Sequence, residues 1–251
     1  MNGRLLWLPQ ALKGAGLTVS TVGGWETRGR PTMHARGGVW HHTAARTGSN
    51  APSLRVVIDG RSDLPGPLCH VLVGRDLTCH VIASGLAHHA GTGGWRGLTG
   101  NASVIGVECE NDGVNEPWSA GMQDVMVRVA AACCDAAGHG ADMWCGHKEW
   151  APRRKVDPWG LSCDDLRRRT ADLLQPPTTP EDDDVTIEWA TRMTMRQLLG
   201  RGPKDEVELK FHMSELARLG DAAYLRWLEV QPEAQAWARR IGAEVRSPDG
   251  T

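Results

Sequence analysis

The chain has 251 residues, a length that fits one large domain or a main domain with a small appendage. Its formal net charge of −2 argues against nucleic acid as a partner and against a polybasic membrane anchor. With 41% hydrophobic residues the chain can bury a sizeable core, yet no apolar run is long enough to span a bilayer.

The seven cysteines indicate a reducing environment. Their number is odd, and no two of them have the Cys-x-x-Cys spacing. The apolar run at the N-terminus is too short for a secretory signal peptide. We therefore expect the protein to be made in a reducing cytosol, with free thiols that pack as small buried hydrophobic groups.

Strands and helices are predicted to alternate along the first 175 residues. In the first part we expect a short helix ending near Gly16, strands at 17–22 and 38–40, a short helix at 52–58, a hairpin of strands at 68–73 and 78–83, a Gly-rich loop at 85–100 and a strand at 103–110. In the second part we expect a helix between Ser119 and Gly138, a strand at 142–145 and a helix at 166–174. This order predicts an α/β domain in which helices flank a central mixed β-sheet.

The composition changes after residue 175. Residues 176–184 are rich in Pro and Asp, which is typical of a linker. Residues 185–251 are charged and contain many helix-forming residues, so we expect a small helical C-terminal region. The chain is thus predicted to consist of a main domain at 1–175, the linker and this C-terminal region.

Residues 145–158 concentrate groups that bind metals. His147 and Asp157 are ten positions apart, with Lys155 between them, on a segment too rich in Pro and Arg to form a helix. His41 and His42 follow a predicted strand far upstream, and because successive strand side chains alternate, only one of them can bind the same ion. Two His and one Asp suit a catalytic zinc site, which leaves one position for a water whose pKa falls to about 7.

A metal-dependent hydrolase also needs a general base and a group that stabilises the oxyanion. Glu108 and Glu110 share one face of the strand predicted at 103–110, so both are candidates for the base. Lys155 lies two residues before Asp157, close enough to direct its ammonium group at a carbonyl oxygen on the metal.

Four segments resemble those of zinc N-acetylmuramoyl-L-alanine amidases, a family that also contains the peptidoglycan-recognition proteins. They are Trp40–Ala44, Ala87–Gly91, Ile105–Glu108 and Gly146–Pro158, in the family's order. The resemblance covers residues 1–175. The start of the chain, including Leu5–Pro9 and Gly24–Gly29, is most similar to endolysins of phages that infect actinobacteria.

The resemblance implies a role for each candidate residue. It implies Zn²⁺ bound by His41, His147 and Asp157, with Glu108 as the base and Lys155 as the group that stabilises the oxyanion. His89 and Trp95 lie in the Gly-rich loop, where they either line a substrate groove or anchor the loop.

The implied reaction is hydrolysis of the amide between N-acetylmuramic acid and L-alanine in peptidoglycan, by a phage endolysin that lyses its host. Two alternatives stay open: recycling of soluble muropeptides in the cytosol, and binding of peptidoglycan without cleavage. The three implied zinc ligands disfavour the second alternative. Without a signal peptide, we expect the protein in the host cytoplasm, acting at the cell wall after release. We expect no membrane insertion, and a C-terminal region that binds wall polymer or self-associates.

Overall fold

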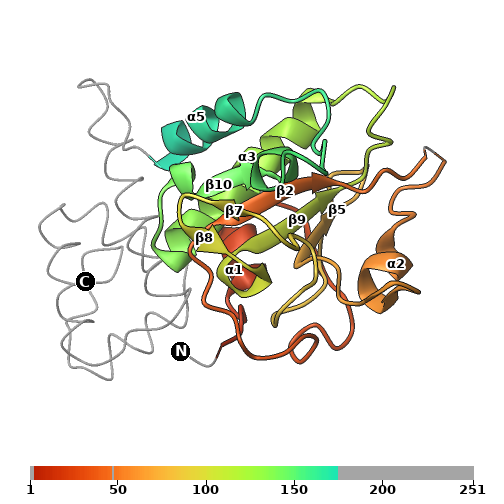
Figure 1. The fold of residues 1–251 in the computed structure, drawn as a ribbon, viewed down its shortest axis with the longest axis vertical. Helices are drawn as coiled ribbons and strands as arrows, with labels where there is room; N and C mark the ends of the chain where they lie inside the picture. The colour runs from red at the N-terminus through yellow and green to blue at the C-terminus, as the bar shows by residue number, and fades with distance from the viewer. Residues whose placement is uncertain (1–2, 47, 175–251) are drawn as a thin grey trace, which may run out of the picture. The chain divides into compact units, whose positions relative to one another are not determined.

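The computed structural model describes residues 3–46 and 48–174, a unit that ends at Leu174 (Figure 1). The predicted linker at 176–184 and the predicted helical region at 185–251 lie outside the described residues, so both stay predictions. No helix of the described residues is long and apolar enough to cross a membrane.

Six strands form the central sheet, and the predicted α/β class with a mixed sheet is confirmed. The strands of this sheet are β1 (Val19–Thr21), β2 (Gly38–His42), β5 (Val71–Val73), β6 (Cys79–Val81), β9 (Ile105–Cys109) and β10 (Trp144–Gly146). Their order is β1-β6-β5-β9-β2-β10, and only the β5–β6 pair is antiparallel. Because β2 and β9 are parallel neighbours at the centre, their carboxyl ends deliver side chains to the same edge of the sheet.

Five helices and two short hairpins complete the described unit. The helices are α1 (Leu8–Gly14), α2 (Leu54–Asp59), α3 (Ala120–Ala137), α4 (His147–Trp150) and α5 (Cys163–Leu174). Two-residue strands pair as β3 (Gly60–Arg61) with β4 (Leu64–Pro65), and as β7 (Gly94–Trp95) with β8 (Leu98–Thr99). Single 3-10 turns lie at Asn101–Ser103 and Ala141–Met143. The predicted loop at 85–100 therefore contains a small hairpin.

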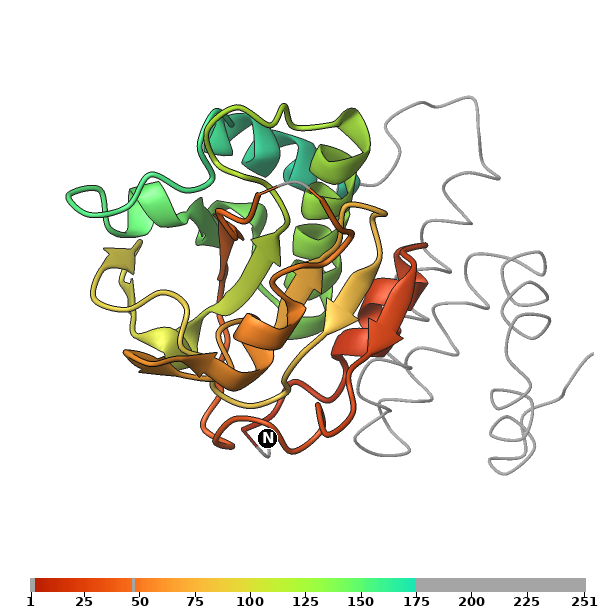
Figure 2. The ribbon, with the colours of Figure 1, turned by 90° about the vertical axis from the view of Figure 1, so that its right-hand side faces the viewer.

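The two faces of the sheet are covered differently (Figures 1 and 2). On one face, α1, α3 and α5 pack against strand residues that include Trp40 and Val107, which form the main core. On the opposite face, α2 and the loops between β6 and β9 cover the sheet. Since strand side chains alternate, His41 and Glu108 point to this second face, under the loops.

Helix α3 follows its sequence pattern closely. Ser119 Oγ accepts a hydrogen bond from the backbone N–H of Met122, and Gly138 ends the helix in the left-handed conformation. The apolar stripe that includes Met126 and Val129 is buried in the core. All seven cysteines are free and buried, as the spacing predicted.

The prediction that residues 145–158 contain no helix is wrong for α4. One helical turn forms because Glu149 Oε2 accepts from the backbone N–H of Gly146 at 2.8 Å, which satisfies a free donor at the helix start. Arg167 of α5 holds the same carboxylate with two hydrogen bonds of 2.8 Å. The helix places the metal-binding candidate His147 at its first position.

Candidate metal centre

Strand pairing brings His41 and Glu108 together. In the parallel register of β2 and β9, His41 is the partner of Glu108. Glu108 Oε1 lies 3.9 Å from His41 Nδ1. His41 is only 1% exposed, so this edge of the sheet forms the floor of a site that the loops above it enclose.

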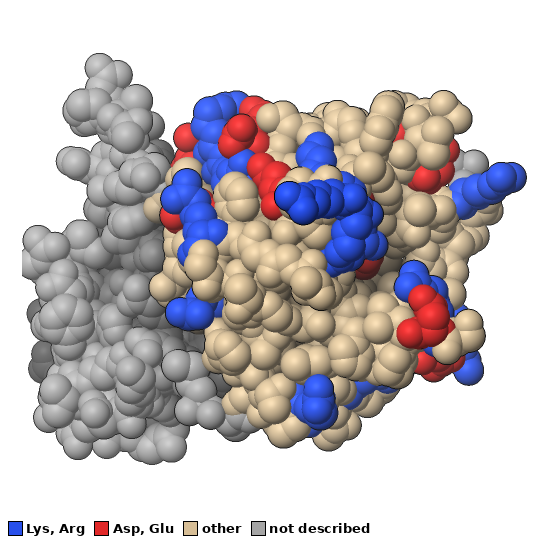
Figure 3. Space-filling model, in the orientation of Figure 1, with Lys and Arg blue, Asp and Glu red and all other residues tan. Residues whose placement is uncertain are grey.

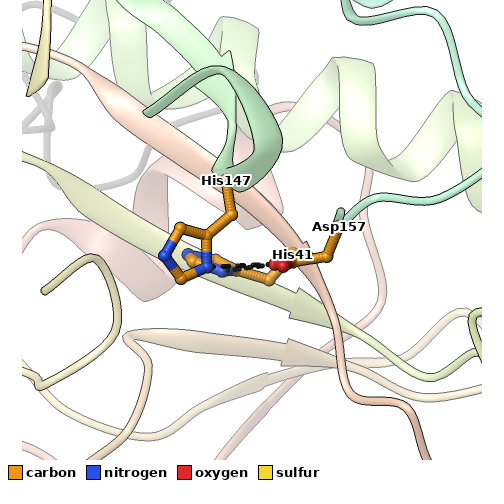
Figure 4. Close-up of side chains that lie close together, drawn as sticks. All are labelled: His41, His147 and Asp157. Atoms are coloured by element: carbon orange, nitrogen blue, oxygen red, sulfur yellow. Dashed lines mark hydrogen bonds and ion pairs between the residues drawn. The ribbon is translucent and has the colours of Figure 1, made fainter. Parts of the chain in front are cut away.

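His41, His147 and Asp157 form a cluster from three different elements (Figure 4). Asp157 Oδ2 lies 3.0 Å from Nδ1 of His41 and 3.1 Å from Nδ1 of His147. All three residues are buried, and their ligand atoms lie within 4.8 Å of one another. Among the described residues they are the one group of His, Cys, Asp and Glu with metal-binding geometry.

The hydrogen bonds behind the two histidines determine where their protons lie. The Nε2 atom of His147 faces the carbonyl oxygen of Ala90 at 3.0 Å, and that of His89 faces the carbonyl oxygen of Val104 at 3.2 Å. A carbonyl only accepts, so both Nε2 atoms carry a hydrogen. The neutral ring of His89 then has an acceptor at Nδ1, which receives the Nε2–H of His41 at 3.1 Å.

This proton arrangement leaves the inner nitrogens of both ligand candidates without hydrogens. In an imidazole that carries its single hydrogen on Nε2, Nδ1 is an acceptor, and the Nδ1 atoms of His41 and His147 both face the carboxylate of Asp157, which is an acceptor as well. Three lone pairs that converge in a buried space require a shared proton or a cation. The donor set therefore fits a zinc ion, which prefers neutral imidazole and carboxylate ligands.

The ionisation states agree with this fit. Burial lowers the pKa of His41 to about 4, so the ring is neutral at pH 7. Burial alone would raise the pKa of Asp157, but in the metal-free site a proton shared with Nδ1 of His147 and His41 outweighs that effect and holds its pKa well below the ordinary value. A neutral imidazole and an ionised carboxylate are the forms that bind metal ions.

Glu108 has the environment of a general base. Its Oε2 atom is buried and has no hydrogen-bond partner within residues 3–46 and 48–174. Burial, followed by the nearby charge of Asp157, raises the pKa of Glu108 to about 8. A carboxyl group with a raised pKa, an unpaired oxygen and its other oxygen 3.9 Å from a candidate metal ligand is suited to proton transfer.

Glu110, the other candidate base, is already saturated with hydrogen bonds. It lies just beyond β9 and accepts from Thr43 Oγ1 at 2.7 Å and from Ser53 through both its backbone N–H and its hydroxyl. Arg75 lies 3.8 Å away. These contacts tie α2 to the sheet edge and leave Glu110 with a structural task.

Lys155 lines a pocket of about 190 Å³ beside the cluster. Arg61 and Arg154 line the same pocket, together with the candidate ligand His147. Lys and Arg side chains stand out on the face of the described unit drawn in Figure 3. Three basic residues therefore line the pocket beside the cluster, and one of them, Arg61, is paired with Asp63 at 3.1 Å.

The two loop residues with predicted substrate contacts lie in different places. His89 lines the pocket but also contacts His41 directly. Trp95 does not line the pocket; its Nε1 donates to the carbonyl of Asp142 at 2.8 Å, and its ring lies 4.9 Å from the guanidinium of Arg167. These contacts anchor the loop, and a role for Trp95 in substrate binding stays a prediction.

Comparison with known proteins adds a family assignment. The sequence model of the family described as N-acetylmuramoyl-L-alanine amidase matches residues 31–160, just over half of the chain. No curated protein matches the chain.

Three solved structures are similar to this chain. The catalytic domain of XlyA has 20% sequence identity and a TM-score of 0.44, with 61% of this chain and 99% of that one covered. A selenomethionine derivative of AmpD has 20% identity and a TM-score of 0.49, covering 67% and 97%. AmiD from E. coli, in complex with anhydro-N-acetylmuramic acid-L-Ala-D-gamma-Glu-L-Lys, has 20% identity and a TM-score of 0.44, covering 66% and 80%.

Proposed function

Since this chain belongs to the N-acetylmuramoyl-L-alanine amidase family, we propose that it is a zinc-dependent hydrolase of the amide bond between N-acetylmuramic acid and L-alanine in peptidoglycan. The observation that carries this proposal is the convergence of three potential ligand atoms from His41, His147 and Asp157, with the buried carboxyl group of Glu108 3.9 Å from His41. Bound there, zinc supplies a Lewis acid for the carbonyl and lowers the pKa of a water molecule.

Glu108 moves the proton. Its unpaired Oε2 accepts a proton from the attacking water and returns it to the nitrogen of the leaving L-alanine, so that the carboxyl group ends each cycle as it began. The raised pKa favours this second step, because a carboxyl group that binds its proton more firmly than usual is a better match for an amine acceptor near neutral pH. A cation bound by Asp157 would offset the negative charge of that residue. One cause of the raised pKa of Glu108 would then be removed, and the carboxylate form of Glu108 would stay accessible.

Lys155 stabilises the negative charge that develops on the carbonyl oxygen. Lys155 lines the pocket beside His147. Within the described residues, its ammonium group donates no hydrogen bond. A cation that is already in place costs no reorganisation when the charge appears. The other positive groups of the pocket, Arg61 and Arg154, favour an anionic peptide next to the scissile bond.

The experiment is product analysis on purified peptidoglycan. Wild-type protein is expected to generate free α-amino groups of L-alanine without new reducing sugar ends, because the cleaved bond is the lactyl–alanine amide. Glu108→Gln is expected to bind the same amount of zinc and to release peptides about 10²-fold to 10⁴-fold more slowly. New reducing ends, or new amino groups on another residue, would contradict the proposed bond.

We extend the substrate to intact cell wall, which corresponds to an endolysin that lyses the host cell. The support for this is the similarity of Leu5–Pro9 and Gly24–Gly29 to endolysins of phages that infect actinobacteria. Rates on intact walls and on soluble muropeptides distinguish the two amidase roles. An enzyme that cleaves only soluble muropeptides would be a recycling amidase, and a protein that binds walls without releasing peptides would be a binding module.

A further inference from the structure

One short segment, His89–Gly91, contacts both histidines of the metal centre from behind. The ring of His89 faces His41, with Nδ1 of His89 3.1 Å from Nε2 of His41. The carbonyl oxygen of the next residue, Ala90, accepts from Nε2 of His147 at 3.0 Å. The ring planes of His41 and His89 are nearly perpendicular, at 89°, so the contact runs through the ring edge of His41.

The direction of the proton in the His41–His89 contact follows from the far side of His89. Its Nε2 must donate to the carbonyl of Val104, so its Nδ1 accepts and His41 must donate. We infer that His89 is a positioning residue of the metal centre, because by accepting the Nε2–H of His41 it directs the free Nδ1 of His41 at the cation. This inference rests on the proposed function, since it presupposes a cation bound there.

The surroundings of His89 hold its ring in this one position. A Cβ atom on Gly106 of β9 would lie 2.4 Å from Cγ of His89, so the ring packs directly on the backbone of the strand. The ring of buried His70 stands at 79° to that of His89, with 5.5 Å between the ring centroids. Since the space is full, His89 has little freedom to turn its Nδ1 away from His41.

The backbone of the segment is fixed by a single side chain. Oδ1 of Asn101 accepts hydrogen bonds from the backbone N–H groups of His89, Ala90 and Gly91, at 3.2, 2.8 and 3.3 Å. The outer partners of both ligand histidines therefore belong to one pinned loop. Such partners raise metal affinity because they select the tautomer and the orientation of the ligand ring.

The first test measures the zinc dissociation constant of the full-length protein, by competition with a chromophoric chelator. His89→Leu leaves the Nε2–H of His41 without an acceptor and is expected to weaken zinc binding by about 10–100-fold. His89→Asn can place its amide oxygen where Nδ1 stood, and is expected to recover most of the affinity. The matched control is His34→Leu, because His34 is exposed and its ring lies 3.3 Å from the nearby carbonyl oxygen of Thr32, away from the metal centre's three ligand candidates.

A second test displaces His89 without removing a polar group. Gly106→Ala forces the ring aside and is expected to weaken zinc binding in the wild-type background, but not further in a His89→Ala background, where the clash is absent. Gly14→Ala is the control, since a Cβ atom there meets nothing within 4 Å. Additive effects of the two substitutions would show that Gly106 acts on zinc by another route and would overturn the inference.

The outcomes separate this inference from the proposed function. If wild-type protein binds zinc and His89→Leu binds it equally tightly, or if His89→Asn is as weak as His89→Leu, the positioning role is wrong and the amidase proposal stands. If wild-type protein binds no zinc, the proposed function fails and the inference fails with it. Thermal unfolding of each variant without zinc shows whether a loss of affinity reflects a loss of fold.

Discussion

His41 and Glu108 are register partners on neighbouring parallel strands, and Glu108 Oε1 lies 3.9 Å from His41 Nδ1. This pairing places the candidate base against the candidate metal ligand without any contribution from a flexible loop. The site therefore inherits the rigidity of the sheet centre, and substitutions at the two positions should change chemistry more than stability.

Glu108→Gln is expected to lower kcat/KM on peptidoglycan by about 10²-fold to 10⁴-fold, because the variant cannot carry the proton from water to the leaving amine. Zinc binding is expected to stay within a few-fold of wild type, since Glu108 is not one of the three ligand atoms. Steady-state kinetics together with a zinc titration check both parts. A variant that keeps wild-type activity would remove Glu108 from the mechanism.

Glu110→Gln is the matched comparison, with the same substitution two residues along the chain. Glu110 accepts three hydrogen bonds from Thr43 and Ser53, so an amide nitrogen there must face at least one donor. We expect a loss of about 1–3 kcal/mol in the free energy of unfolding, with kcat/KM of the folded protein nearly unchanged. Chemical denaturation measures the stability and steady-state kinetics the activity. An unchanged free energy of unfolding together with a large loss of kcat/KM would show that Glu110 is the base.

The pH dependence of stability reports the state of Glu108 in zinc-free protein. Its pKa is raised from 4.5 to about 8, mainly by burial and then by Asp157. At pH values between these two pKa values, the folded protein holds a proton on Glu108 that the unfolded chain has lost. The free energy of unfolding therefore falls as the pH rises through this range, by at most about 1.4 kcal/mol per pH unit from this group.

Glu108→Gln isolates that contribution. The lowered pKa of His41, about 4, makes stability rise with pH below its ordinary value of 6.5, but both proteins share this effect. The difference in unfolding free energy between variant and wild type is thus expected to grow in favour of the variant from pH 5 to pH 8. Urea denaturation at several pH values measures it, and a difference independent of pH would show that Glu108 has an ordinary pKa.

Asp157→Asn tests the third ligand. The substitution keeps the shape of the side chain but removes its negative charge. Loss of a residue that only hydrogen-bonds a metal ligand weakens binding by about 10–100-fold, and we expect a larger loss of zinc affinity here. Loss of that charge should also lower the pKa of Glu108 and reduce the pH dependence described above. Asp172→Asn is the control, because Asp172 is exposed on α5. Equal zinc affinities in the two variants would rule Asp157 out as a ligand.

Lys155→Met tests the stabilisation of the oxyanion. If the ammonium group acts only when charge develops, kcat should fall by about 10²-fold to 10³-fold while KM changes little. Arg153→Met removes an equal charge two residues away, from an exposed residue outside the pocket, and should be nearly neutral. A comparable loss in both variants would point to general attraction of an anionic substrate instead.

Patterns within single segments were predictable from the sequence. The cap at Ser119, the stop at Gly138 and the buried stripe between them depend on neighbours in the chain, and the structure confirms them. The two histidines after a strand and the spacing of His147 and Asp157 were visible in the same way. The structure brings these residues together in one buried cluster.

Relationships between distant segments were not predictable from spacing. Helix α4 begins with a local hydrogen bond from Gly146 to Glu149, but the carboxylate of Glu149 is held in place by Arg167, 18 residues away. The sequence favoured Glu108 as the base but kept Glu110 on the same strand face as a competitor, and the contacts of Glu110 with Thr43 and Ser53 separate the two. From the sequence, His89 was predicted only to lie in a loop. Its contact with His41 joins residues 48 positions apart and depends on how the chain folds back over the sheet.

The most direct test of zinc-dependent amide hydrolysis is the release of L-alanine amino groups from peptidoglycan by chelator-stripped protein, as zinc is added back. We expect no release without the metal and a rise that saturates at one zinc per chain, with release by Glu108→Gln about 10²-fold to 10⁴-fold slower at every zinc level. Full release by stripped protein, or saturation without any dependence on added zinc, would contradict the metal centre formed by His41, His147 and Asp157.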